Sequence, residues 1–340
     1  MKRYAAFLII SIVAFGCENQ TESSLDEILS VPAHFPAIVH PKNNAPSELV
    51  IDLGKKLFFD PRLSGNNQVA CGSCHFQELA FADSVPFSQG ANGKTLRNTQ
   101  PIFNLAFKQE FFWDGGATSL ERQIFGPLEN HAEMGQELFE LMRELKADKD
   151  YPELFDKAFN SGGINSNNIA KALAQFQRSI ISSNSKYDKW LAGDENALNQ
   201  LEKQGHELVK AKCGSCHSGV LFTDESYHNT GLDSTWNSDS NLNVLKGRYR
   251  ISNDFADIGA FKTPTLRNLK FTAPYMHDGR FKNLDQVLNH YTAGVKDSEY
   301  LDDMLEANNP IIVEEDKAAI LAFLYVLNDE ELVRDEKYRP

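Results

Sequence analysis

Apolar residues recur every three or four positions in four stretches of this chain, which is the periodicity of an amphipathic helix. The stretches are residues 49–59, 138–147, 169–181 and 316–332. Convincing runs of alternating apolar and polar residues, which would indicate strands, are absent. Asn, Gly and Ser concentrate in 160–168 and 229–245, which predicts loops there. The pattern therefore predicts a mainly α protein with long loops.

The first residues have the pattern of an export signal. Two basic residues precede the apolar run YAAFLIISIVAF, which is too short to span a bilayer comfortably. The run ends in Gly-Cys, which resembles a bacterial lipoprotein cleavage site, although Phe15 is bulky for such a site. We expect residues 1–17 to be a lipoprotein-type signal peptide, with ordinary secretion as the alternative. Residues 18–45 would then be a polar tether and N-terminal extension. We expect the protein to be periplasmic and to be anchored to the membrane by a lipid on Cys17.

The composition suits a folded protein that does not bind nucleic acid. The chain has 340 residues, which suggests two domains, and 41% of them are hydrophobic. The formal net charge is −13, with acidic residues spread along the chain, so phosphate backbones would be repelled.

Apart from Cys17, every cysteine lies in one of two identical CGSCH motifs. Two thiols at this spacing can add to the vinyl groups of one haem, and the adjoining His then ligates the iron. A zinc site or a redox dithiol is the alternative, but neither needs a His after each pair. We therefore expect two c-type haems. The expected attachment residues are Cys71, Cys74 and His75 in the first motif and Cys213, Cys216 and His217 in the second.

The repeat extends beyond the cysteines. TLRN occurs at 95–98 and at 265–268, and WDGGATSL (113–120) parallels HDGRFKNL (277–284). The chain thus divides into two cytochrome-c-like halves near residues 185–195.

The halves differ in the residues that could ligate iron from its second side. After His75 the chain has no His before His131 and no Met before Met134. The second half offers four candidates close together: Met276, His277, His290 and Tyr291. This asymmetry predicts an open iron in the first half and a closed one in the second.

Three segments resemble the bacterial dihaem cytochrome c peroxidases and their MauG-type relatives. They are LGKKLFFDPRLSGNNQVACGSCH, FFWDGGATSLERQIFGPLENHAEMG and TPTLRNLKFTAPYMHDGRFKNLDQVLNHY, and the resemblance spans roughly residues 45–330. It implies two cytochrome-c-like haem domains with long ordered loops. Residues 46–190 would be the peroxidatic domain and 191–335 the electron-transfer domain.

The resemblance also implies catalytic residues. A Gln and a Glu ten residues later line the distal side of the family's peroxide-binding haem, and they match Gln123 and Glu133. A carboxylate there can move a proton between the peroxide oxygens, while an amide orients the peroxide. Glu129 is the rival carboxylate. Trp113 matches the family Trp that lies between the haems.

The family holds a calcium ion between its domains. Asn98, Thr272 and Pro274 match its protein ligands, which are a side-chain oxygen and two backbone carbonyls. Oxygen donors with few protein charges suit calcium with several waters.

The sequence departs from the standard peroxidases after the first motif. They carry a His that blocks the first iron until the second haem is reduced. Here the corresponding loop, 84–98, has no His, and the matching place is near Gly90. We therefore expect a five-coordinate or water-bound first haem that needs no reductive activation.

A second departure concerns the other iron. The family's usual axial Met matches Tyr291 here, and MauG-type enzymes use Tyr at this place. A phenolate lowers the iron potential. Tyr291 is thus the expected sixth ligand of the second haem, with Met276 or His290 as alternatives.

These features predict an exported dihaem peroxidase, a cytochrome-c peroxidase-like oxidoreductase. It would reduce hydrogen peroxide with electrons from a small donor protein such as cytochrome c. The alternatives are a MauG-type oxidase of a side chain in a partner protein and a non-catalytic dihaem electron carrier. Family members are often homodimers, although no stretch here identifies a dimer surface.

Overall fold

The computed structural model describes residues 28–236, 245–305 and 311–340. The predicted signal peptide and Cys17 lie outside them. The described α-helices are α2 (Glu48–Phe58), α3 (Leu120–Gln123), α4 (Phe125–Glu129), α5 (Leu138–Ala147), α6 (Tyr151–Ala158), α7 (Ser166–Ser179), α8 (Lys186–Leu191), α9 (Gln200–Lys212), α10 (Tyr249–Ser252), α11 (Leu284–Asn289) and α12 (Lys317–Val326). Strands β1 (Tyr227–His228) and β2 (Phe261–Lys262) form a short antiparallel pair with Tyr227 opposite Lys262. The prediction of a mainly helical protein is confirmed.

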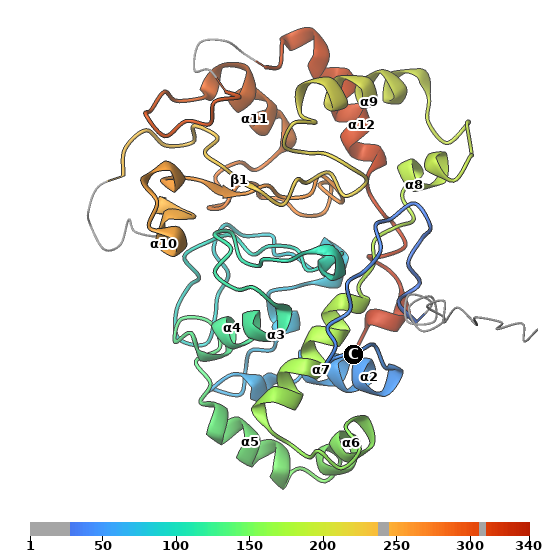
Figure 1. The fold of residues 1–340 in the computed structure, drawn as a ribbon, viewed down its shortest axis with the longest axis vertical. Helices are drawn as coiled ribbons and strands as arrows, with labels where there is room; N and C mark the ends of the chain where they lie inside the picture. The colour runs from blue at the N-terminus through green and yellow to red at the C-terminus, as the bar shows by residue number, and fades with distance from the viewer. Residues whose placement is uncertain (1–27, 237–244, 306–310) are drawn as a thin grey trace, which may run out of the picture.

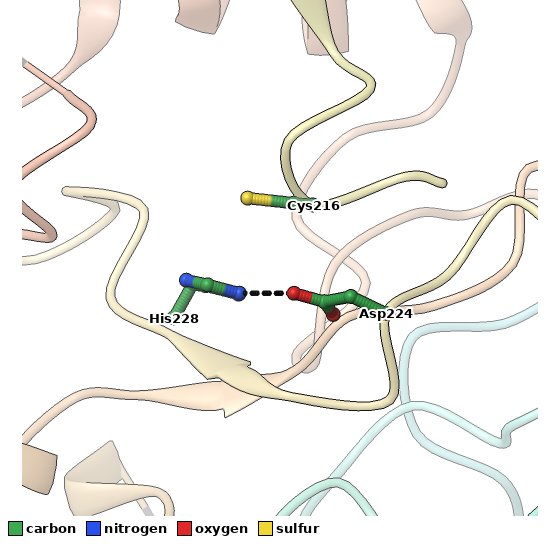
Figure 2. Close-up of side chains that lie close together, drawn as sticks. All are labelled: Cys216, Asp224 and His228. Atoms are coloured by element: carbon green, nitrogen blue, oxygen red, sulfur yellow. Dashed lines mark hydrogen bonds and ion pairs between the residues drawn. The ribbon is translucent and has the colours of Figure 1, made fainter. Parts of the chain in front are cut away.

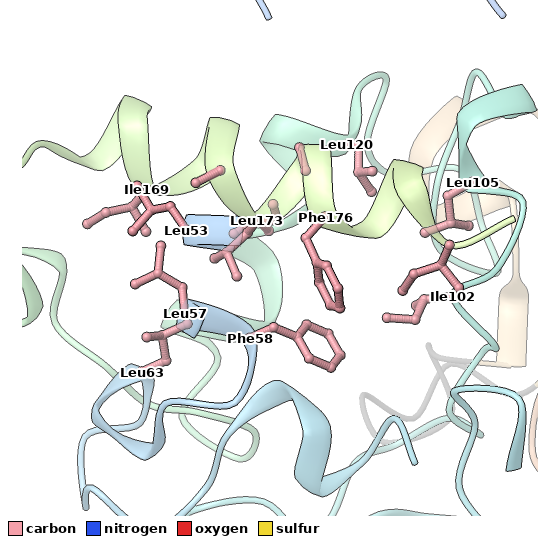
Figure 3. Packing of buried hydrophobic residues seen from close by; sticks show 14 of the residues in the cluster. Leu53, Leu57, Phe58, Leu63, Ile102, Leu105, Leu120, Ile169, Leu173 and Phe176 are labelled. Atoms are coloured by element: carbon pink, nitrogen blue, oxygen red, sulfur yellow. The ribbon is translucent and has the colours of Figure 1, made fainter. Parts of the chain in front are cut away.

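Figure 1 shows two lobes, with α2 to α7 in one and α9, α11 and α12 in the other. The lobe of α2 to α7 is built on the packing of α2 against α7. Leu53, Leu57 and Phe58 of α2 meet Leu173 and Phe176 of α7 in a hydrophobic core (Figure 3). Fully burying a Leu or Phe side chain contributes about 1.5–3 kcal/mol, so this interface stabilises the lobe substantially.

The second lobe repeats this arrangement with α9 and α12. Where α2 crosses α7, a Cβ on Gly54 would lie 2.0 Å from the carbonyl oxygen of Ala172. Where α9 crosses α12, a Cβ on Gly205 would lie 1.9 Å from the carbonyl oxygen of Ala319. Each helix pair therefore needs a glycine where the backbones meet. The internal repeat predicted from the sequence extends to helix packing.

The N-terminal extension packs across both lobes. The Phe35 ring contacts the Phe107 ring. The guanidinium of Arg267 lies over the Phe35 ring, with Cζ 4.9 Å from the ring centroid. Asp188 accepts two hydrogen bonds from Arg267 at 2.8 and 2.9 Å, and His34 lies 3.0 Å from the same carboxylate. The polar tether predicted for 18–45 is thus packed against the protein over its described part.

The end of the chain differs from the expected helix 316–332. Helix α12 ends at Val326, because Asp329 takes hydrogen bonds from the backbone of Ser183 and Asn184. The chain then returns to the first lobe, where Leu332 joins that core (Figure 1). Among the described helices, none combines the length and apolar character needed to cross a bilayer.

Candidate active site

The first CGSCH motif begins with a 3₁₀ turn at Cys71–Ser73, and its His is fixed by the backbone that follows. The Nδ1–H of His75 donates to the carbonyl oxygen of Phe81 at 2.9 Å. This bond sets the tautomer and leaves Nε2 able to ligate a metal. Burial lowers the pKa of His75, which keeps the imidazole neutral as a ligand must be.

The second motif reproduces this geometry. Helix α9 ends where Cys213 caps it, and His217 Nδ1 lies 3.1 Å from the carbonyl oxygen of Phe222. Cys71 packs on the first hydrophobic core and Cys213 on the second. Each lobe therefore presents its own thiols and imidazole.

The space beside the first motif fits a haem. A cavity of about 730 Å³ has His75 in its lining together with apolar side chains such as Ile102 and Leu105. The four motif thiols form no disulfide. Burial raises the pKa of Cys71 to about 12, so this thiol is protonated at neutral pH. Free thiols, a neutral imidazole and apolar walls are the donor set that covalent haem attachment requires.

Gln123 and Glu133 line the same cavity as His75. Gln123 ends α3, and Glu133 lies in the turn after α4. Burial raises the pKa of Glu133, and a 2.7 Å hydrogen bond from Asn130 Nδ2 partly offsets this. Glu129, the rival carboxylate, is exposed and is not among the residues that line the cavity.

The loop 84–98 lies against the Glu133 turn at Gly90. A Cβ on Gly90 would lie 2.1 Å from the carbonyl oxygen of Ala132 and 2.6 Å from that of Glu133. The backbone N–H of Ala91 donates to the same Glu133 oxygen at 2.5 Å. A larger residue at position 90 would therefore displace the turn that carries the carboxylate.

Trp113 lies at the junction of the two lobes. Its indole N–H donates to the carbonyl oxygen of Asn98 at 2.9 Å, and its own carbonyl accepts from the backbone of Lys262 in β2 at 2.8 Å. Its side chain is buried, and Trp113 lines the same cavity as His75. This indole is therefore held between the lobes by contacts to both.

The three residues expected to bind calcium are all buried. Asn98 donates its backbone N–H to the carbonyl oxygen of His277 at 2.8 Å. This bond joins the loop of the first lobe to the segment of the second that carries Thr272 and Pro274. The binding of calcium itself stays a prediction.

Tyr291 lies in a π-helical segment, His290–Gly294, that continues α11. Single π-turns inside helices recur at functional sites. Tyr291 packs against the second core, as Cys213 does. Burial raises the pKa of its phenol, and the nearby thiols of Cys213 and Cys216 add to this effect. The side chain is thus close to the second attachment site.

The two alternatives to Tyr291 are placed differently. His290 Nε2 lies 2.8 Å from the carbonyl oxygen of Thr230, so this nitrogen is already engaged. Met276 occupies a tight turn with φ +73°. Ligation of the second iron by Tyr291, with Met276 or His290 as alternatives, stays a prediction.

One cluster had no signal in the sequence. His228 is held between two carboxylates, with Nε2 2.9 Å from Asp224 and Nδ1 2.6 Å from Asp302. Figure 2 shows that Cys216 lies beside the first of these pairs. If Cys216 attaches a haem as predicted, its sulfur is not available as a metal ligand, and His228 and Asp224 would flank the second haem. Asp302 is distant in sequence, which is why no local motif reveals the contact.

Comparisons with known proteins agree with this geometry. The family model for di-haem cytochrome c peroxidases matches residues 48–196. The "Methylamine utilization protein MauG" of Methylorubrum extorquens is 36% identical over 91% of this chain and 87% of that protein. The "Cytochrome-c peroxidase IdrP1" of Pseudomonas sp. (strain SCT) is 33% identical over 91% of this chain and 88% of its own length.

Solved structures give the same result. A MauG-like protein associated with microbial copper homeostasis is 34% identical and superposes with a TM-score of 0.83 over 91% of this chain and 97% of that one. The diheme peroxidase BthA from Burkholderia thailandensis, at 21% identity and a TM-score of 0.72, shares the fold over 85% of this chain and 88% of its own. This chain belongs to the di-haem cytochrome c peroxidase family.

Proposed function

We propose that this protein is an exported dihaem peroxidase that reduces hydrogen peroxide at the first CGSCH site. The observation that carries the proposal is the shared cavity of His75, Gln123 and Glu133. His75 would ligate the iron, and the bound haem would supply the redox chemistry of peroxide reduction. Peroxidases among the relatives support the same reaction class.

The chain's own residues supply proton transfer and orientation. The carboxylate of Glu133 would take the proton from the peroxide oxygen that is nearest the iron and return it to the departing oxygen. The amide of Gln123 would orient the peroxide by hydrogen bonding. Trp113 would carry electrons between the lobes, and the second site would receive them from a small donor protein such as a cytochrome c.

Three further features belong to this proposal. A calcium ion at Asn98, Thr272 and Pro274 would hold the lobes together at the Asn98–His277 contact. Export would place the protein in the periplasm, with a lipid on Cys17 as its anchor. Family members that form dimers suggest that this chain does so too.

We expect the first haem of the fully oxidised protein to be high-spin. The loop 84–98 contains no His, and Gly90 cannot be enlarged without displacing the Glu133 turn. Electron paramagnetic resonance of the oxidised protein should therefore show a high-spin ferric signal without prior reduction. Two low-spin ferric haems and no high-spin species would overturn this expectation.

A MauG-type oxidase of a partner-protein side chain is the second candidate. The position of Tyr291 beside the second attachment site favours it, as does the identity with a MauG protein. A phenolate ligand would lower the potential of the second iron and slow electron entry from an ordinary cytochrome c.

Steady-state turnover separates the two candidates. We expect a peroxidase to oxidise reduced cytochrome c at peroxide concentrations that saturate the first site, whereas a MauG-type enzyme would turn over slowly. The assay should compare several small donors of different potential under the same conditions. Rapid peroxide reaction combined with slow oxidation of every donor would favour the MauG-type function.

A further inference from the structure

Four cationic side chains are among the residues that line the cavity of Trp113. Arg97, Lys108, Arg250 and Lys262 all line it, together with His75. Three of the four have carboxylate partners. Asp114 lies 2.8 Å from Arg97 and 3.1 Å from Arg250, and Glu225 lies 3.2 Å from Lys262.

Lys108 differs from the other three. Within the described part of the chain, its ammonium makes no ion pair or side-chain hydrogen bond. Burial lowers the pKa of Lys108, and the like charge of Lys262 lowers it further, whereas attraction to Glu225 raises it. Since Glu225 already pairs with Lys262, it does not neutralise both lysines. The Lys108 side chain is half-buried in the lining of the cavity, so its ammonium can meet an anionic group that fills this space.

The missing anion has a source in the same cavity. A haem is apolar over most of its surface but carries two propionate carboxylates on one edge. The cavity offers both kinds of surface, because its lining includes the apolar side chains of Ile102 and Leu105 as well as the ammonium of Lys108. A carboxylate that meets Lys108 would gain a charge-assisted hydrogen bond.

We propose that Lys108 binds a propionate carboxylate of the haem held by Cys71, Cys74 and His75. This inference rests on the proposed haem attachment at the first motif. The contact would fix the propionate edge of the haem at Lys108, in the cavity that Trp113 also lines. It also places a positive charge beside the ring, which favours the ferrous state over the ferric state.

The test uses the holoprotein and three variants. Lys108→Met removes the charge, Lys108→Arg keeps it, and Lys94→Met removes an exposed lysine of the same lobe as a matched control. The readout is the midpoint potential of each haem, measured by spectroelectrochemistry.

We expect Lys108→Met to raise the ferric-to-ferrous ratio of the first haem about tenfold at a fixed applied potential. This corresponds to a fall of about 59 mV in the midpoint potential of that haem. Lys108→Arg should leave that potential near the wild-type value because it keeps the positive charge. Lys94→Met should also leave it unchanged, because water screens the exposed charge of Lys94. The propionate carboxylate band in the redox-difference infrared spectrum should shift in Lys108→Met and not in Lys94→Met.

An unchanged first-haem potential in Lys108→Met, or a shift confined to the second haem, would overturn the proposal. Loss of the first haem in Lys108→Met but not in Lys108→Arg would support it, and loss in both would count against it. A pyridine haemochrome assay of the wild-type protein tests the underlying assumption separately. Fewer than two haems per chain would refute the proposed attachment, whatever the role of Lys108.

Discussion

Replacing Glu133 with Gln should slow the reaction of the oxidised protein with hydrogen peroxide by about 10²–10⁴-fold, the usual contribution of a positioned proton-transfer group. Gln keeps the size of the side chain and its capacity for hydrogen bonding, but it cannot take up the proton. Glu133 lines the cavity with His75 and Gln123, whereas Glu110 and Asp114 are held by arginines. The rate of the Soret change in stopped-flow mixing measures the effect.

Glu129→Gln is the matched control. This carboxylate lies four residues earlier, is exposed and does not line the cavity, so its loss should leave the peroxide rate unchanged. Equal losses in both variants would indicate a general electrostatic effect. A normal rate in Glu133→Gln would remove Glu133 from the mechanism.

The same carboxylate predicts the pH dependence of the reaction. Burial raises the pKa of Glu133, so the reactive carboxylate form is present above this raised pKa and is lost as the pH falls through it. The peroxide rate should therefore decline towards acid. Asn130 donates to the carboxylate, and Asn130→Ala should move the decline to higher pH without abolishing the reaction.

The second large effect is expected for Tyr291→Phe. If the phenolate ligates the second iron, its removal should change the absorption spectrum of that haem and raise its midpoint potential, because a strong anionic donor is lost. The first haem should keep its spectrum. Oxidation of reduced cytochrome c should become faster if the low potential of the second iron limits electron entry.

Tyr275→Phe is the control for this variant. Tyr275 packs against the same core as Tyr291, and its hydroxyl donates to the carbonyl oxygen of Leu269 at 2.6 Å. Its loss should leave both haem spectra unchanged. An unchanged second haem in Tyr291→Phe, together with a changed one in Met276→Leu, would assign the ligand to Met276.

Much of the fold could be predicted from the sequence because its helices have clear apolar periodicity. The helix predicted over 138–147 has those bounds in the structure, and that predicted over 49–59 is shifted by one residue. Helix α9 was not predicted, because its mean hydropathy is low and Gly205 interrupts its buried face. The last predicted helix was too long, since its end depends on contacts of Asp329 with residues far away in the chain.

The candidate site also contains some residues that the sequence indicated and others that it did not. Gln123 and Glu133 were expected because their segment resembles that of the family, and both line one cavity with His75. Their catalytic roles stay predictions. The two carboxylates that hold His228 and the environment of Lys108 could not be predicted. Both arise where the lobes or distant loops meet, and neither residue belongs to a motif.

The most direct test of the central claim is to mix the fully oxidised protein with one equivalent of hydrogen peroxide in a stopped-flow spectrophotometer. The claim is that the first CGSCH site is an open peroxide-reactive haem served by Glu133. It predicts a prompt change of the Soret band without prior reduction, and strong slowing of that change in Glu133→Gln. A Soret band that does not respond to peroxide would contradict the account and indicate a dihaem electron carrier.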